Sequence, residues 1–415
     1  MPVARRICVV TSYAAAAEPR GPRHAIAAKM AFPDANVVLV DLAASGLARS
    51  PEPELLRARG IERRTVEFPS RGQGLARLAA RKLNTRMGHL AFAQLGVLME
   101  SVFGERTQGL TRALTDTPAD VYIAHNIETL LPAIRAAARH HAAVVFDCME
   151  FYSDMGESQH PTEAAAARAL EAKSLPRCAL VIASSDIMAD ALAAAYGMRR
   201  PLAAYNVPPA ERILPARKGD GLNLYWRNST IGFGQRGLED MLDAMAMLPT
   251  DVHLHLQGRQ SAEGAAQLAS RVASLGLTGR VHVLPPYAPH EAVVKAAVHD
   301  IGLCLERKGP RNHDLTVSNK MFDYHMAGLA VIATDLPALA DVVQRSGGGV
   351  VCRPGDPASL VEAILALRSS PKRLAELQTN ARRFALQTAN LEMELEKIAE
   401  AMQRALAQFK AEQHG

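Results

Sequence analysis

The sequence has few cysteines, few aromatic residues and no long apolar run, and each shortage excludes a class of protein. The five cysteines stand singly, without C-x-x-C or metal-ligand spacing, which indicates reduced core residues of a cytoplasmic protein. No stretch approaches about 20 consecutive apolar residues, and the apolar run near the amino terminus is too short for a signal peptide. With 5% aromatic residues and a net charge of +5, a nucleic-acid surface is not expected.

The remaining composition is that of a globular α/β protein. Hydrophobic residues make up 48% and charged residues 21% of the 415 residues, which excludes disordered and fibrous proteins. Short apolar strands alternate with helical patterns, which predicts doubly wound parallel sheets with helices on both faces. The predicted strands are residues 7–10, 37–40, 66–68, 121–124, 144–146, 180–183, 222–226, 252–256, 281–284, 301–305 and 330–333. After the first strand, a loop that extends to Arg23 and a helix near residues 25–30 are expected.

A proline-bearing segment, residues 201–209, divides these strands into two halves. It breaks regular structure, and the chain is long enough for two domains of about 200 residues. The sequence therefore predicts an amino-terminal domain of residues 1–209, a second domain of residues 210–385 and a terminal region of residues 386–415.

The second half contains a strand, a loop and a helix with the features of a phosphate site. Ser318 is expected to cap the helix by accepting a backbone N–H. The start of such a helix attracts anions, and Lys320 adds a full positive charge. Asp323 follows one turn later, where it can accept hydrogen bonds from sugar hydroxyls, and Gly328 ends the helix. The alternative is an ordinary capped helix with a solvated Lys320–Asp323 pair.

A glycine-bearing loop precedes the first predicted helix of the second half, residues 238–248. Gly234 and Gly237 permit close approach of the backbone to a ligand. Arg236, just before the helix, can pair with a diphosphate through two hydrogen bonds. An ordinary turn is the alternative interpretation of this loop.

In the first half, polar residues follow the predicted strands. Ser12, His125, Asp147 and Glu150 come directly or shortly after a strand, and ligands of doubly wound sheets bind at the carboxyl ends of the strands. We expect His125 to reach into a cleft. The alternative is a loop histidine that hydrogen-bonds the backbone.

Three stretches resemble retaining glycosyltransferases of family 4. The run SNKMFDYHMAGLAVIATD, residues 318–335, is similar to the family's donor-binding signature. The runs VYIAHNIETLLPA, residues 121–133, and VVFDCMEFYSD, residues 144–154, are similar to two family patterns of the first domain. The resemblance covers most of residues 120–368 and implies the GT-B fold, in which two Rossmann-like domains face each other across a cleft. It also implies that the terminal helix crosses back to the first domain.

The resemblance, together with these positions, gives roles to the candidate residues. Arg236 and Lys320 would stabilise a departing diphosphate, and His125 would position the donor sugar. The donor-binding residues would be Gly234, Gly237, Ser318, Asn319 and Asp323, and the acceptor side would hold Ser12, Asp147 and Glu150. Leu315 stands where the common form of the signature has a glutamate, and Asp314 or Glu306 could substitute for it only if the loop is shifted.

The expected function is retaining transfer of a hexose-type sugar from a nucleoside diphosphate sugar to a glycan or lipid-linked acceptor. The setting would be synthesis of cell-surface polysaccharide or glycoconjugates, and neither metal nor cofactor is expected. One alternative is a catalytically silent subunit that binds nucleotide sugar, which Leu315 favours. The other is a nucleotide-sugar epimerase, which needs a cluster of acids and bases over the sugar.

A helical stretch at residues 71–106 carries basic residues beside a row of leucines. A basic amphipathic face can rest on anionic lipid, which would place a cytoplasmic enzyme at the inner face of the membrane. The alternative is a solvated, charged helix on the surface of a domain.

Overall fold

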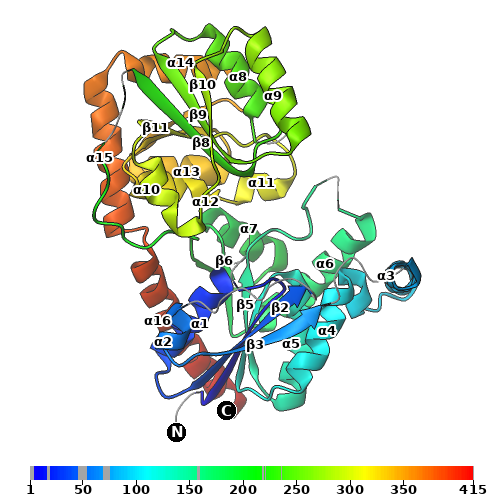
Figure 1. Cartoon of the computed structure of the whole chain (residues 1–415). Coiled ribbons are helices and arrows are strands. Elements are labelled where there is room, and N and C mark those ends of the chain that lie inside the picture. The colour runs from blue at the N-terminus through cyan, green and yellow to red at the C-terminus, as the bar shows by residue number, and fades with distance from the viewer. Residues whose placement is uncertain are drawn as a thin grey trace. The chain divides into compact units, whose positions relative to one another are not determined.

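The computed structural model describes residues 4–15, 19–44, 54–68, 75–156, 159–216, 219, 221–234 and 236–414. The chain divides into two compact units (Figure 1). Unit 1 comprises Met1–Ala204, Pro310–Asn312 and Glu394–Gly415, and unit 2 comprises Tyr205–Gly309 and His313–Met393. Among the described helices, none combines the length and apolar character that a membrane crossing requires.

Unit 1 is built on a parallel sheet with the strand order β3-β2-β1-β4-β5-β6-β7. The strands are β1 Arg6–Thr11, β2 Asn36–Ala44, β3 Glu62–Phe68, β4 Val121–His125, β5 Ala143–Cys148, β6 Leu180–Ala183 and β7 Leu202–Ala203. The helices are α1 Arg20–Ala31, α2 Glu54–Ala58, α3 Leu75–Leu95, η1 Glu100–Phe103, α4 Glu105–Thr115, α5 Ile127–His140, α6 Pro161–Ser174, η2 Leu175–Arg177, α7 Asp186–Tyr196 and α16 Leu391–His414.

The strand order of unit 1 reverses between β1 and β4. Right-handed crossovers then place the helices after β1 and after β4 on opposite faces of the sheet, so both strands are covered on both sides. This is why both strands contain a continuous run of apolar residues. All five residues of β4 are buried. At the carboxyl edge, Thr11 pairs with His125 and His125 pairs with Asp147. Such a reversal is where doubly wound sheets bind ligands.

Unit 2 has a second parallel sheet with the order β10-β9-β8-β11-β12-β13, which reverses between β8 and β11. The strands are β8 Leu222–Thr230, β9 Val252–Arg259, β10 Val281–Leu284, β11 Ile301–Cys304, β12 Ala330–Thr334 and β13 Gly349–Cys352. The helices are α8 Leu238–Met247, α9 Ala262–Ser274, η3 Pro289–Glu291, α10 Ala292–Ala296, α11 Arg311–Leu315, α12 Asn319–Met326, α13 Pro337–Ser346, α14 Pro357–Arg368 and α15 Pro371–Gln387.

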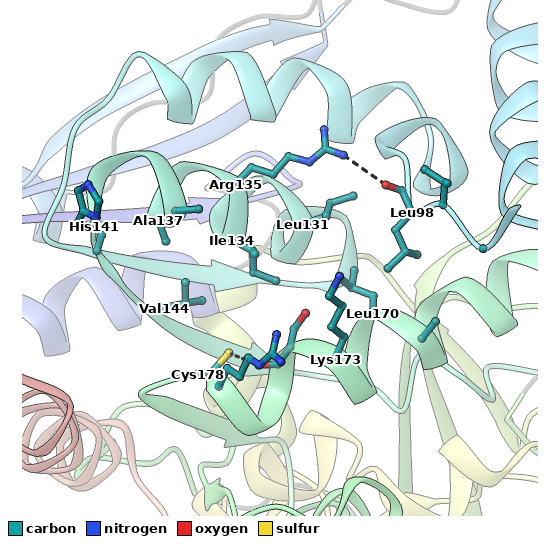
Figure 2. Close-up of a pocket in the computed structure, with 17 residues that line it drawn as sticks. Leu98, Leu131, Ile134, Arg135, Ala137, His141, Val144, Leu170, Lys173 and Cys178 are labelled. Carbon is teal, nitrogen blue, oxygen red and sulfur yellow. Dashed lines mark hydrogen bonds between the residues drawn. The ribbon is translucent and has the colours of Figure 1, made fainter. Parts of the chain in front are cut away.

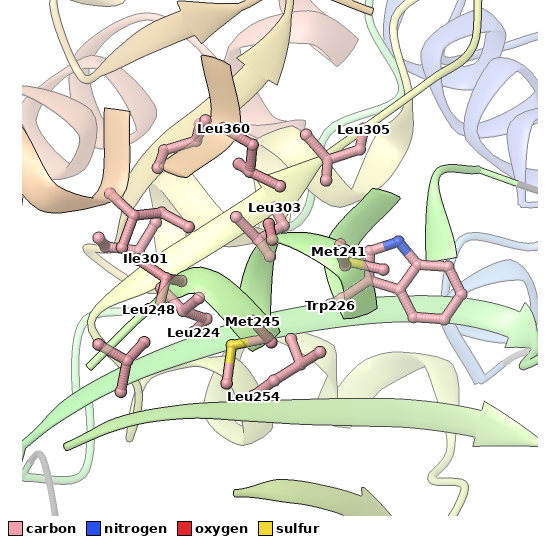
Figure 3. Close-up of a cluster of buried hydrophobic side chains, with 14 of the residues drawn as sticks. Leu224, Trp226, Met241, Met245, Leu248, Leu254, Ile301, Leu303, Leu305 and Leu360 are labelled. Atoms are coloured by element: carbon pink, nitrogen blue, oxygen red, sulfur yellow. The ribbon is translucent and has the colours of Figure 1, made fainter. Parts of the chain in front are cut away.

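A hydrophobic cluster around Trp226 forms one core of unit 2 (Figure 3). Met241 of α8 and Leu305, just after β11, belong to the same cluster as this fully buried indole. The indole N–H donates a hydrogen bond to the carbonyl of Arg236 over 3.3 Å. The core therefore holds the loop that carries Arg236.

The alternation of parallel strands and helices confirms the predicted α/β fold with two doubly wound sheets. Three boundaries differ from the expected ones. The first helix begins at Arg20, not near residue 25, because the Gly21-Pro22 pair falls within its first turn, where proline is tolerated. Strand β8 continues to Thr230 through an irregular register, so part of the expected glycine loop is strand.

The third difference concerns the helical stretch expected at residues 71–106, of which residues 71–74 lie outside the described residues. Helix α3 ends at Leu95, and Gly96 follows with φ +66°, a conformation that ends helices. Residues 96–99 carry no helix or strand.

Candidate functional site

Two cations of unit 2 converge on one carboxylate at the point where its strand order reverses. Glu306 follows β11 closely, and its Oε1 atom lies 2.6 Å from Nη1 of Arg236 and 3.2 Å from Nζ of Lys320. The structure thus brings together two of the three residues expected to be catalytic. Glu306 also donates its backbone N–H to the Thr334 hydroxyl over 3.0 Å, which fixes the carboxylate next to β12.

Helix α12 positions Lys320, whose side chain is only 4% exposed. Its ammonium group lies 5.8 Å from the centre of the Trp226 ring, a cation–π distance. The apolar stripe of the helix is buried as predicted, and Gly328 follows with φ +73°. Ser318 is the residue before the helix, as predicted, but the expected capping hydrogen bond is wrong, because the Ser318 side chain forms none.

A second ion pair lies one turn further along α12. Asp323 pairs with Arg227 of β8, and the Arg227 backbone N–H donates to the Tyr324 hydroxyl over 3.0 Å. Asn319, the first residue of α12, is exposed, whereas Lys320 is buried against Glu306. Lys320 therefore is not the solvated residue of the alternative interpretation. Helix α12 instead places buried Lys320 and partly buried Asp323 next to charged partners.

The electrostatics of Glu306 follow from this network. Burial alone would raise the pKa of the Glu306 carboxyl, but Lys320 and Arg236 hold that pKa below its ordinary value. The carboxylate is therefore ionised at neutral pH, and the two cations are arranged around a negative group. Lys320 and Arg236 can also donate hydrogen bonds to the oxygens of a phosphate.

The loop before α8 requires glycine at residue 237. Its φ is +71°, and a Cβ atom there would lie 2.9 Å from Cβ of Leu305, so a larger residue would be both strained and crowded. Gly234, with φ +76°, donates its backbone N–H to the Glu239 side chain. Both glycines thus help to shape the turn that presents Arg236.

In unit 1, Asp147 forms the centre of a fully buried ionic network. Arg20 donates to both oxygens of Asp147, over 2.8 Å from Nε and 2.5 Å from Nη2. Nδ1 of His125 lies 2.9 Å from Oδ2 of Asp147. Burial opposes ionisation of Asp147, yet the surrounding Arg20, His24 and His125 hold its pKa well below the ordinary value.

This network fixes the orientation of the His125 ring. Because ionised Asp147 can only accept, Nδ1 of His125 donates the hydrogen. In the neutral ring Nε2 is then an acceptor, and it has no hydrogen-bond partner among the described residues. The ring is fully buried, so His125 does not reach into an open cleft as expected. The histidine is bonded to a side chain, not to the backbone as in the alternative interpretation.

His24, His125 and Asp147 bring three potential metal ligand atoms within 4.8 Å of one another. The Arg20 guanidinium already occupies both oxygens of the carboxylate. A cation at this position would face the positive charge of Arg20 at close range. The group is therefore better suited to orienting His125 than to holding a metal ion.

The other expected residues of unit 1 lie near the same edge of the sheet. Ser12 Oγ accepts a hydrogen bond from the Asn126 side-chain amide over 3.1 Å, and the Tyr152 hydroxyl donates to Oδ1 of Asn126 over 3.2 Å. Glu150 accepts a 2.6 Å hydrogen bond from Asn312, which belongs to unit 1. Ser12 and Glu150 are therefore held by polar neighbours.

Sequence reasoning missed Arg20, His24 and Glu306 as members of these networks. Arg20 and His24 were expected in or just after a loop, and helix α1 instead carries them into the interior. Glu306 had been considered only as a substitute for the glutamate missing at Leu315. Its position directly after a buried strand was the available signal.

Two family models match the chain. The model described as "Glycosyl transferase 4-like domain" matches residues 9–206, and the model "Glycosyl transferases group 1" matches residues 230–370. Together the two matches span about four fifths of the sequence. The chain belongs to the group 1, family 4-like glycosyltransferases.

Solved structures of glycosyltransferases share the fold of the whole chain. HepE from Anabaena, solved in complex with UDP, is 16% identical with a TM-score of 0.68, covering 96% of this chain and 100% of its own. A glycosyltransferase from Rickettsia africae is 11% identical (TM-score 0.67; 97% and 98% covered). Sucrose-phosphate synthase from Thermosynechococcus elongatus is 14% identical (TM-score 0.65; 97% and 99% covered). These similarities confirm the GT-B architecture. No curated protein matches the chain by sequence.

Proposed function

We propose that this glycosyltransferase is a retaining enzyme that moves a hexose-type sugar from a nucleoside diphosphate sugar to a hydroxyl of a glycan or lipid-linked acceptor. The setting is synthesis of cell-surface polysaccharide or glycoconjugates. The observation that carries the proposal is the convergence of Arg236 and Lys320 on a single oxygen of Glu306. Both cations lie where a doubly wound sheet binds its ligand.

In the proposed mechanism, Arg236 and Lys320 stabilise the leaving diphosphate. Negative charge builds up on the diphosphate as the glycosidic bond breaks, and cations that are already in place stabilise this charge with little reorganisation. Glu306 neutralises the cations in the absence of substrate. Asp323, held by Arg227, accepts hydrogen bonds from the ribose, and no metal, cofactor or protein nucleophile is required.

His125 positions the donor sugar in this proposal. Its Nδ1–H is committed to Asp147, so Nε2 is the ring atom that can accept a hydrogen bond from a sugar hydroxyl. Because the ring is fully buried, this contact requires the neighbouring side chains to move when the donor binds. Asp147 was expected on the acceptor side, but its carboxylate is fully buried and Arg20 donates to both of its oxygens. In this proposal it therefore acts through the histidine as a positioning residue. Ser12 and Glu150 belong to the acceptor side.

A uridine nucleotide is the first donor to test. The Anabaena structures were solved with UDP and with UDP-glucose, and we propose the same donor class here. The test uses a panel of UDP-, GDP- and ADP-sugars. For each of them, the thermal stabilisation of the protein is measured, and then the release of nucleoside diphosphate in the presence of candidate acceptors. Retention is read from the anomeric configuration of the product by NMR. A product of inverted configuration would contradict the retaining mechanism.

The silent binding subunit stays a second candidate because Leu315 is 6% exposed and offers no carboxylate. A silent subunit would be stabilised by the nucleotide sugar but would never release the nucleoside diphosphate. An epimerase would convert the sugar while its nucleotide stays attached. The same panel therefore separates the three functions.

We also propose that α3 rests on the inner face of the membrane. Leu83, Met87 and Leu90, spaced at one helical face, are 59%, 61% and 61% exposed. Arg81, Lys82 and Arg86 on the same helix are exposed as well. An apolar row beside basic side chains is typical of helices that lie on anionic lipid, and it would bring the enzyme to a lipid-linked acceptor.

A further inference from the structure

A groove in unit 1 has no role in the proposed sugar transfer. Its volume is about 950 Å³, at the upper end of the range for small-molecule pockets. It runs between α5 and α6 over Val144 of β5 and reaches Cys178, just before β6 (Figure 2). Val144 lies at the start of β5 and Cys178 just before the start of β6. The groove is therefore at the edge of the sheet opposite the carboxyl edge that holds His125.

The floor and walls of the groove are apolar, whereas its charged groups are all basic. Leu98, Leu131, Ile134 and Leu170 line it together with several alanines. Its basic residues are Arg135, His141, Lys173 and Arg177, and among the residues that the structure describes no aspartate or glutamate lines it. A ligand that fits must therefore combine an apolar body with a negative group.

Two of these basic side chains are available to such a ligand. Lys173 and Arg177 are exposed, and neither forms an ion pair with any residue that the structure describes. Arg135, in contrast, is held by Glu100 and by the carbonyl of Leu98. Lys173 and Arg177 thus place unneutralised positive charge at the rim of an apolar groove.

The groove is continuous with the exposed apolar surface of α3. Gly96, Val97 and Leu98, which directly follow α3, form part of its lining. In this segment Leu95 is 75%, Val97 47% and Met99 40% exposed. Large apolar side chains that gather at one place mark an interaction site for a protein or a membrane. Here they adjoin, in the chain, residues that line a cavity with cationic groups.

We infer that this groove binds an anionic phospholipid of the bilayer, with an acyl chain between α5 and α6 and the phosphate on Lys173 and Arg177. The inference rests on the proposed membrane contact of α3. A buried chain gains about 0.8 kcal/mol for each methylene group, so the groove would convert a weak surface contact into selective docking. A polar protein partner would not bury the apolar walls of the groove.

The groove is tested with a soluble lipid, lysophosphatidylglycerol below its micelle concentration, by calorimetry. Ala169→Phe fills the groove, and Ala172→Phe on the same helix is the matched control, because Ala172 is exposed and does not line it. We expect Ala169→Phe to weaken binding at least tenfold and Ala172→Phe to leave it unchanged. Equal binding by both variants would overturn the inference. So would a tenfold preference for farnesyl phosphate, which would assign the groove to a polyprenyl acceptor.

The charge at the rim is tested by flotation with vesicles. The wild-type protein should bind phosphatidylglycerol vesicles at least tenfold better than phosphatidylcholine vesicles. Lys173→Glu/Arg177→Glu should abolish this preference, because each basic residue near an anionic surface contributes substantially to binding. Lys372→Glu/Arg373→Glu on α15 makes the same change of net charge and should have no effect. A preference that survives Lys173→Glu/Arg177→Glu would overturn the inference.

The membrane proposal and the groove can fail separately. Leu83→Asp/Leu90→Asp should reduce vesicle binding and leave binding of the soluble lipid unchanged, because neither residue lines the groove. If vesicle binding depends on Leu83 and Leu90 but not on Ala169 or Lys173, the proposed membrane contact of α3 stands. The inference that the groove binds a phospholipid is then overturned.

Discussion

Replacing Lys320 by methionine should weaken binding of a nucleoside diphosphate while leaving the fold intact. Methionine keeps the length of the side chain and its contact with Trp226 but removes the charge. Glu306 keeps Arg236 as its partner, 2.6 Å away, so the buried carboxylate is not left uncompensated. The thermal midpoint of the variant should therefore stay close to that of the wild type.

The magnitude follows from the contacts of Lys320. A hydrogen bond between charged groups is worth about 1.5–3 kcal/mol. In the wild type, Lys320 must loosen its 3.2 Å contact with Glu306 to hold a phosphate, so the lower end of that range applies. We expect a loss of about 1.5 kcal/mol, roughly tenfold in Kd.

The assay is calorimetric titration with UDP, and Lys295→Met is the matched control. Lys295 is an exposed lysine of α10 that pairs with Glu291 over 3.5 Å, so its loss should change the Kd less than twofold. An unchanged Kd in a folded Lys320→Met variant would refute the assignment of Lys320 to the diphosphate.

Three further predictions test the charged groups. Glu306→Gln should tighten binding of inorganic pyrophosphate several-fold in calorimetry, because a carboxylate no longer competes for the cations; weaker binding would contradict this. Asp147→Asn should lower the free energy of unfolding by about 3–5 kcal/mol in urea, because Arg20 loses a buried counter-ion. Asp243→Asn, which removes the exposed partner of Arg271, should lower it far less. Burial lowers the pKa of His325 to about 3, so its contribution to stability falls as pH drops below 6.5. Between pH 8 and pH 5, the free energy of unfolding of the His325→Phe variant should therefore fall by about 2 kcal/mol less than that of the wild type. An equal fall in both proteins would contradict this.

The sequence predicted the elements whose signals are local. The strand and helix around Lys320 were evident from a continuous apolar run and from a helical apolar stripe, and both are buried in the structure. The helix boundary at Gly328 followed from its preference for a left-handed conformation. These signals depend only on neighbouring residues.

The networks depend on distant pairs, which periodicity does not reveal. Glu306 and Arg236 are 70 positions apart, and Arg20 and Asp147 are 127 apart. Ser318 has the residue type of a cap, but its side chain is not used as one. On α3 the basic residues were visible in the sequence, whereas the exposure of Leu83, Met87 and Leu90 depends on which face packs against the rest of unit 1.

The most direct test of the central proposal is the rate at which the protein releases nucleoside diphosphate from a nucleotide sugar in the presence of acceptor. Arg236→Met/Lys320→Met should reduce this rate by a factor of at least about 100, because fixed charges that stabilise a developing anion are typically worth that much each. Release by the double variant at the wild-type rate would contradict the account.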